Sequence, residues 1–93
     1  MSYAQLQEQV RKYDEKRGWI DQSYQTVLHM QEEVGEISRE LLAEQEYKKR
    51  EFKKEELGQE IADLLYLTIK LANQYKLDLD RVWSDAFVRY EKK

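Results

Sequence analysis

The chain contains no proline, and only Gly18, Gly35 and Gly58 supply glycine. Proline and glycine are the residues that most strongly end or weaken helices, whereas the abundant Glu, Lys, Gln and Leu favour them. The sequence therefore predicts an all-α fold. Its 93 residues suit one domain, which we expect to span 1–93, and a hydrophobic content of 41% argues against disorder.

Apolar residues at three- and four-residue spacing predict four helices. We place them at about 3–16, from 21 or 23 to 44, at about 55–75, and after Asp78 or Asp80. Ser2 and Gln5 have the spacing of a capping box at the start of the first helix. The second helix carries a stripe that we expect to be buried, made of Val27, Met30, Val34, Ile37 and Leu41.

Charge and hydropathy exclude several classes of protein. The net charge is −3, so a broad basic surface for nucleic acid is not expected. No apolar stretch reaches the length of a membrane span, and the polar first residues do not form a signal peptide. The absence of cysteine fits a reducing compartment, and we expect a cytoplasmic protein.

We read the charged segment 44–56 as a solvated helix end and connector.

Two acidic motifs stand on consecutive predicted helices. The first contains Glu32, Glu33 and Glu36, and the second contains Glu60 and Asp63. Carboxylates three residues apart share a helix face, with Cβ atoms about 5–6 Å apart, and they repel each other. Neither motif includes a lysine or arginine that would relieve this repulsion. The pattern therefore indicates that these carboxylates have a function, because they do not stabilise their helices.

The surroundings of the motifs support a cation site. Asp63 lies within the apolar run IADLLYLTI, where an ionised carboxylate is costly unless it is paired or bound to metal. Gly35 and Gly58 stand inside helices beside the motifs, and we expect them to permit a close approach of the two helices. Clustered carboxylates without cysteine suit Mg²⁺ or Mn²⁺.

Other interpretations of these acids are weaker. Each motif alone is typical of a solvated helix face, and their combination favours a site. A di-iron bundle requires Glu-x-x-His pairs, which the chain lacks. His29, the single histidine, has no such partner, and we interpret it as a surface or packing residue.

The segments EEVGEISREL, ELGQEIADLLYLTIKLAN and LDLDRVW resemble the MazG-like branch of the all-α nucleoside triphosphate pyrophosphohydrolases. The resemblance covers about 19–83 and rests on EExxE followed by ExxD on the next helix. It implies a four-helix bundle that forms a homodimer or homotetramer. It also implies Mg²⁺-dependent cleavage of a nucleoside or deoxynucleoside triphosphate to the monophosphate and pyrophosphate, as in house-cleaning of the nucleotide pool.

The resemblance also implies roles for particular residues. Glu33, Glu36, Glu60 and Asp63 would be the metal ligands, and Glu32 would lie behind them or help to hold a further ion. Three other residues are candidate substrate contacts, each with a purely structural alternative. Trp19 would stack on a base or cap the core, Asn73 would bond to sugar or base or end its helix, and Lys70 would meet a phosphate or extend to solvent.

The end of the chain departs from the family pattern. Many relatives carry a lysine and a terminal arginine in this segment, whereas DLDRVWSDAFVRYEKK has Ala86 where the lysine is expected. Arg89, Lys92 or Lys93 would then have to take over its role. The string ADLLY is also similar to phosphoribosyl-ATP pyrophosphohydrolases, a sister branch whose substrate we rank second. A non-enzymatic helical assembly module that binds cations is the remaining alternative.

Overall fold

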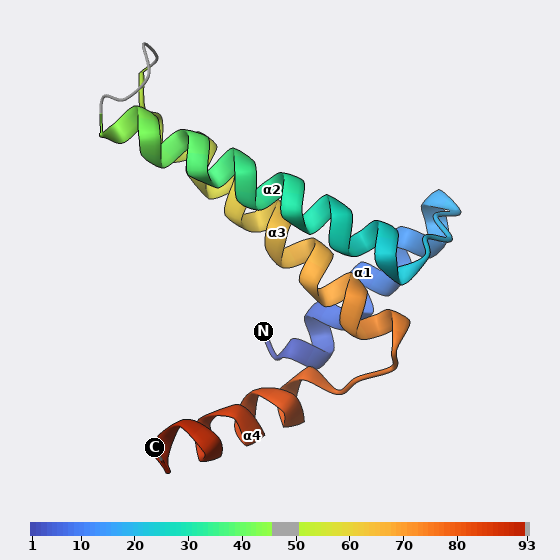
Figure 1. Ribbon diagram of the computed structural model, residues 1–93. Coiled ribbons are helices and arrows are strands. Elements are labelled where there is room, and N and C mark those ends of the chain that lie inside the picture. The colour runs from blue at the N-terminus through green and yellow to red at the C-terminus, as the bar shows by residue number, and fades with distance from the viewer. Residues whose placement is uncertain (46–50, 93) are drawn as a thin grey trace.

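A computed structural model describes residues 1–45 and 51–92 of the chain, and it is all-α. Figure 1 shows its four helices, which are α1 (Tyr3–Arg17), α2 (Ser23–Glu44), α3 (Lys54–Gln74) and α4 (Leu79–Glu91). The predicted number and order of helices are confirmed. Part of the charged connector expected at 44–56 lies outside the described residues, and α3 begins at the end of that segment.

The two ends of α1 follow from local sequence. The Ser2 hydroxyl accepts a hydrogen bond from the backbone N–H of Gln5 at 3.1 Å, and the Gln5 side chain accepts one from the Ser2 N–H at 2.7 Å. This is the expected capping box. Gly18 ends the helix with φ of 70°, a left-handed conformation in which a residue without Cβ is not strained.

The start of α2 differs from the prediction. The residue before the helix is Gln22, whose N–H donates to the side chain of Gln25 at 2.8 Å, and neither Asp21 nor Ser23 is the cap. The reason lies in the tertiary structure, because the Asp21 carboxylate forms an ion pair with Lys70 of α3. A local capping preference is thus overridden by a partner 49 residues away.

Two aspartates join α4 to α1. Asp78 caps α4 by accepting the backbone N–H of Asp80 at 3.1 Å. The Asp80 carboxylate instead reaches the first turn of α1, where it accepts the N–H groups of Tyr3 at 3.1 Å and Ala4 at 3.0 Å. Carboxylates at helix N-termini satisfy free N–H groups and complement the helix dipole.

The helices α2 and α3 lie side by side as a long hairpin, and α1 crosses α3 near its C-terminal half (Figure 1). Helix α4 packs mainly on α1 and points away from the hairpin. The side chains of Gln7 and Asn73 tie α1 to α3 through two hydrogen bonds of 3.0 Å. This arrangement leaves one side of the hairpin uncovered by the described part of the chain.

The apolar stripe expected to be buried on α2 is only partly covered. Met30 and Ile37 are half-buried, whereas Val27, Val34 and Leu41 are exposed. The prediction of full burial was wrong for a single chain, because α2 packs mainly on α3 and one neighbour covers one side. On α3 and α4 further large apolar side chains are exposed, namely Ile61, Leu65, Val82, Trp83, Phe87, Val88 and Tyr90.

None of the four helices in the described part of the chain is both long enough and apolar enough to cross a membrane.

Candidate metal centre

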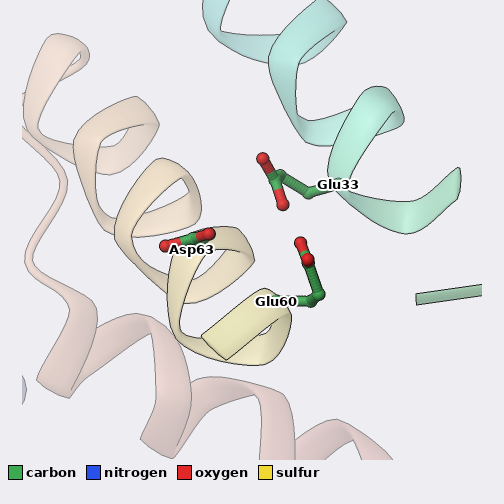
Figure 2. Close-up of side chains that lie close together, drawn as sticks. All are labelled: Glu33, Glu60 and Asp63. Carbon is green, nitrogen blue, oxygen red and sulfur yellow. The ribbon is translucent and has the colours of Figure 1, made fainter. Parts of the chain in front are cut away.

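Three carboxylates from the hairpin converge on one point. Glu33 extends from α2, and Glu60 and Asp63 extend from α3 toward it (Figure 2). One oxygen of each side chain lies within 4.8 Å of the others. Glu60 and Asp63 share a face of α3 because they are three residues apart, and the packing of α2 on α3 adds Glu33. The hairpin therefore brings both acidic motifs together.

The electrostatics of Glu33 reflect this crowding. A hydrogen bond to Glu60 raises the pKa of Glu33 most, followed by the loss of surrounding water and by the negative charges of Glu60, Asp63 and Glu36. Together these effects raise the pKa of Glu33 from 4.5 to about 7. In addition, the buried Oε2 atom of Glu33 has no hydrogen-bond partner among the described residues. A buried carboxylate oxygen without a donor is an open position for a cation.

The raised pKa predicts how the metal-free protein responds to pH. Between about 4.5 and 7, the folded state keeps a proton on Glu33 that the unfolded state has lost. The folded state therefore binds more protons in this window, and its stability falls as the pH rises. We expect the melting temperature in EDTA to decrease over this range, and Glu33→Gln to reduce that slope. A metal-free protein that becomes more stable from pH 5 to 7 would contradict the clustering.

Glu36 and Glu32 lie outside this group of three. Glu36 is half-buried and forms a salt bridge of 2.8 Å with Arg39, which relieves the repulsion within its motif. The sequence predicted no such relief because Arg39 stands beyond the motif. Glu32 is exposed on α2. The negative charge of Glu36 nevertheless contributes to the raised pKa of Glu33, so Glu36 interacts electrostatically with the group of three carboxylates.

Two expectations about the surroundings of the site were wrong. A Cβ atom added to Gly35 or to Gly58 would meet no other atom within 4 Å, so neither glycine serves a close helix approach within the described part of the chain. Asp63 is exposed rather than embedded, although Tyr66 and Leu67, which follow it by one turn on the same face of α3, are half-buried and buried. The apolar run surrounds Asp63 in sequence but does not enclose it in the fold.

A pocket of about 400 Å³ adjoins the three carboxylates. Glu33 and Asp63 form one part of its wall. The other lining residues come from the α1–α2 connection, from α2 and from α3, and they are Trp19, Asp21, His29, Tyr66, Leu67 and Lys70. A site for a small ligand therefore lies directly beside the candidate ligands of a metal ion.

Two residues of the pocket wall, His29 and Lys70, have surroundings that the sequence analysis did not predict. His29 is exposed, as expected, but it lines the pocket, and its position four residues before Glu33 was the signal that it shares that face. Lys70 does not extend to solvent. It is buried, pairs with Asp21, and its ammonium lies 5.4 Å from the centre of the Trp19 ring. Trp19 was a candidate substrate contact, and it is in the pocket wall.

Asn73 lies outside this pocket. Its side-chain nitrogen donates to the Gln7 carbonyl and its side-chain oxygen accepts from the Gln7 amide, each at 3.0 Å. Both groups of the Asn73 side chain are thus hydrogen-bonded to Gln7 between α1 and α3. The basic residues Arg89 and Lys92 lie at the far end of α4 and are not part of the pocket wall either, and Lys93 lies outside the described residues.

The donor set fits a hard divalent cation. The three side chains offer only oxygen atoms, which Mg²⁺ and Mn²⁺ prefer, and Mg²⁺ commonly uses few carboxylates and completes its shell with water and phosphate. The unpartnered Oε2 atom of Glu33 and the mutual repulsion of the acids are both relieved by a positive ion. These residues therefore fit Mg²⁺ or Mn²⁺.

A comparison with protein families agrees with this geometry. Residues 4–86, which include all of α2 and α3, match the phosphoribosyl-ATP pyrophosphohydrolase family. The chain belongs to this family. Phosphoribosyl-ATP pyrophosphohydrolases are part of the MazG-like all-α superfamily, so the resemblance found in the sequence is confirmed at the level of the superfamily, and the matching family is the sister branch that was ranked second. Membership makes the chain a pyrophosphohydrolase, a hydrolase that acts on phosphoric anhydrides.

Neither the curated proteins nor the solved structures contain a match to the chain.

Proposed function

We propose that the chain cleaves the α–β anhydride bond of a nucleoside or deoxynucleoside triphosphate, releasing a nucleoside monophosphate and pyrophosphate with the help of Mg²⁺. The observation that carries this proposal is the convergence of Glu33, Glu60 and Asp63 at the edge of a pocket in a member of a pyrophosphohydrolase family. Mn²⁺ would suit the same oxygen ligands.

The chemistry requires a water oxygen to bond to the α-phosphorus while the α–β bridging oxygen leaves with pyrophosphate. A bound divalent ion would offset the charge of the phosphates and polarise the phosphoryl group that is attacked. The carboxylates Glu33, Glu60 and Asp63 would hold the ion, and one carboxylate of this acidic region would accept the proton of the water. Trp19, which lines the same pocket, would stack on the base.

We further propose that Glu36 joins the ligands when metal is bound and that Glu32 supports them from the same helix. In the structure the Glu36 side chain forms a salt bridge with Arg39 at the surface. Such exposed salt bridges contribute little to the stability of a protein. Glu36 can therefore leave Arg39 and bind a divalent ion with little loss of stability.

A second substrate is favoured by a specific observation. The matching family is that of phosphoribosyl-ATP pyrophosphohydrolases, whose substrate contains the same triphosphate and gives the same pyrophosphate. We place phosphoribosyl-ATP beside the simple triphosphates as a candidate. A non-enzymatic, cation-binding assembly module is not proposed, because the family is one of hydrolases.

A substrate panel tests the proposal. Purified protein with Mg²⁺ is mixed with each ribo- and deoxyribonucleoside triphosphate and with phosphoribosyl-ATP, and pyrophosphate and nucleoside monophosphate are measured separately. We expect both products in equal amounts from at least one substrate. Release of inorganic phosphate instead of pyrophosphate, or no release from any compound, would contradict the proposal. The relative rates decide between the two substrate classes.

We also propose that the working form is a homodimer or homotetramer in the cytoplasm. The support is the number of large apolar side chains that one chain leaves exposed on α2, α3 and α4. Burial of apolar surface drives association, and a monomer rarely leaves so much uncovered. Light scattering that gives the mass of a single chain at micromolar concentration would refute this.

A further inference from the structure

Lys70 is a buried cation in the wall of the pocket. Its exposed fraction is 5%, although it lies on a helix of a small protein where lysine normally reaches water. The ammonium group forms an ion pair with Asp21 and lies 5.4 Å from the ring centre of Trp19 and 5.9 Å from that of Tyr66. These neighbours keep the charge in place inside the pocket wall.

The two partners of the Lys70–Asp21 ion pair differ in how far they are buried. Burial makes an ammonium group expensive unless an anion stays beside it. The Lys70 side chain is 6% exposed, whereas that of Asp21 is 35% exposed. Asp21 can therefore turn to water at little cost, but Lys70 requires an anion at its position. Another anion that enters the pocket can take the place of Asp21 without leaving a charge unpaired.

The position of Lys70 relative to the carboxylates is suited to a phosphate chain. Lys70 follows Asp63 by seven residues, two turns on the same face of α3, which corresponds to about 10 Å along the helix axis. Tyr66 and Leu67 line the turn between them, and all four residues line the same pocket. A ligand that extends from the carboxylates along this face reaches the Lys70 ammonium group.

We propose that Lys70 binds a phosphate of the pyrophosphate portion of the substrate and that Asp21 is the partner this phosphate displaces. The inference rests on the proposed function, because it assumes a polyphosphate ligand in the pocket. It assigns Lys70 as a binding residue for the leaving group, whose negative charge the buried ammonium offsets. Asp21 holds the lysine in position while the pocket has no ligand.

Binding of inorganic pyrophosphate in the presence of Mg²⁺, measured by calorimetric titration, tests this assignment. Lys70→Met keeps the length of the side chain and removes its charge, and we expect it to weaken binding by about tenfold or more. Asp21→Asn removes the competing anion, and we expect it to strengthen binding. The control is Asp85→Asn, since Asp85 is exposed on α4, pairs with Arg81 and does not line the pocket. This variant should bind as the wild type does.

The two variants separate a ligand-binding role from a structural one. If the Asp21–Lys70 pair only fastened the α1–α2 connection to α3, both variants would break the same link and would shift affinity in the same direction. Opposite shifts support the proposal, and any other pattern overturns it. Asp21→Asn also decides the question alone if Lys70→Met does not fold, because unchanged or weaker binding by Asp21→Asn contradicts displacement.

The same titration distinguishes this inference from the proposed function. A wild-type protein that does not bind pyrophosphate would overturn the role of Lys70 even if it hydrolyses nucleotides. Conversely, opposite shifts in a protein that releases no pyrophosphate from any nucleotide would support the role of Lys70 and overturn the proposed reaction.

Discussion

Replacing Glu33 by Gln, or Asp63 by Asn, is expected to reduce pyrophosphate release by about 100-fold or more. Each substitution keeps the shape of the side chain and removes one negative charge from the group that we propose to hold Mg²⁺. Loss of a single group that stabilises charge at a reacting centre has effects of this order. Initial rates of pyrophosphate formation at saturating nucleotide and fixed Mg²⁺ measure the change.

Glu55→Gln is the matched control for this experiment. Glu55 lies in the first turn of α3, on the same helix as Glu60 and Asp63, and it is exposed. The same change of charge at this position should leave the rate near that of the wild type. The three variants should also melt cooperatively in EDTA, at or above the melting temperature of the wild type, which shows that they fold. Rates for Glu33→Gln and Asp63→Asn equal to that of Glu55→Gln would refute the site.

Addition of Mg²⁺ is expected to stabilise the protein strongly. A ligand that binds only the folded state adds about 2.7 kcal/mol to the free energy of unfolding when its concentration is a hundred times its dissociation constant. For a domain of this size that corresponds to an increase of roughly 10–20 °C in melting temperature. Thermal melts in EDTA and in increasing MgCl₂, with ionic strength held constant by NaCl, measure the effect.

Variants show which carboxylates hold the ion. Glu33→Gln should remove most of the Mg²⁺-dependent shift. Glu36→Gln should reduce the shift if this side chain leaves Arg39 to bind metal, as we propose, and its effect should exceed that of Glu32→Gln. A wild-type protein whose melting temperature does not respond to millimolar Mg²⁺ or Mn²⁺ would exclude a metal centre at these residues.

The local features of the fold were predictable because their causes are local. Without proline and with few glycines, the chain has little alternative to helix, and the capping box of Ser2 and Gln5 and the left-handed Gly18 act within a few residues of themselves. The convergence of Glu33, Glu60 and Asp63 was also accessible, since three-residue spacing defines a helix face and consecutive helices tend to pack as neighbours.

Other features depend on partners that are distant in sequence. Asp80 reaches the start of α1, 76 residues away, and Asp21 reaches Lys70 rather than capping α2. The exposure of Asp63 and of the α2 stripe follows from how few helices cover the hairpin, which periodicity does not reveal. The glycines beside the acids suggested a close approach that the described part of the chain does not make.

The sequence by itself determined the helices, the two acidic faces and the superfamily, because helix formation and i, i+3 spacing are short-range properties. Only the tertiary structure decided which acids meet, that Glu36 turns to Arg39, and that Lys70 is buried against Asp21 in the wall of the same pocket. The physical reason is that burial and charge pairing depend on which helices cover a residue. That is decided by packing between helices, which spacing along one helix does not specify.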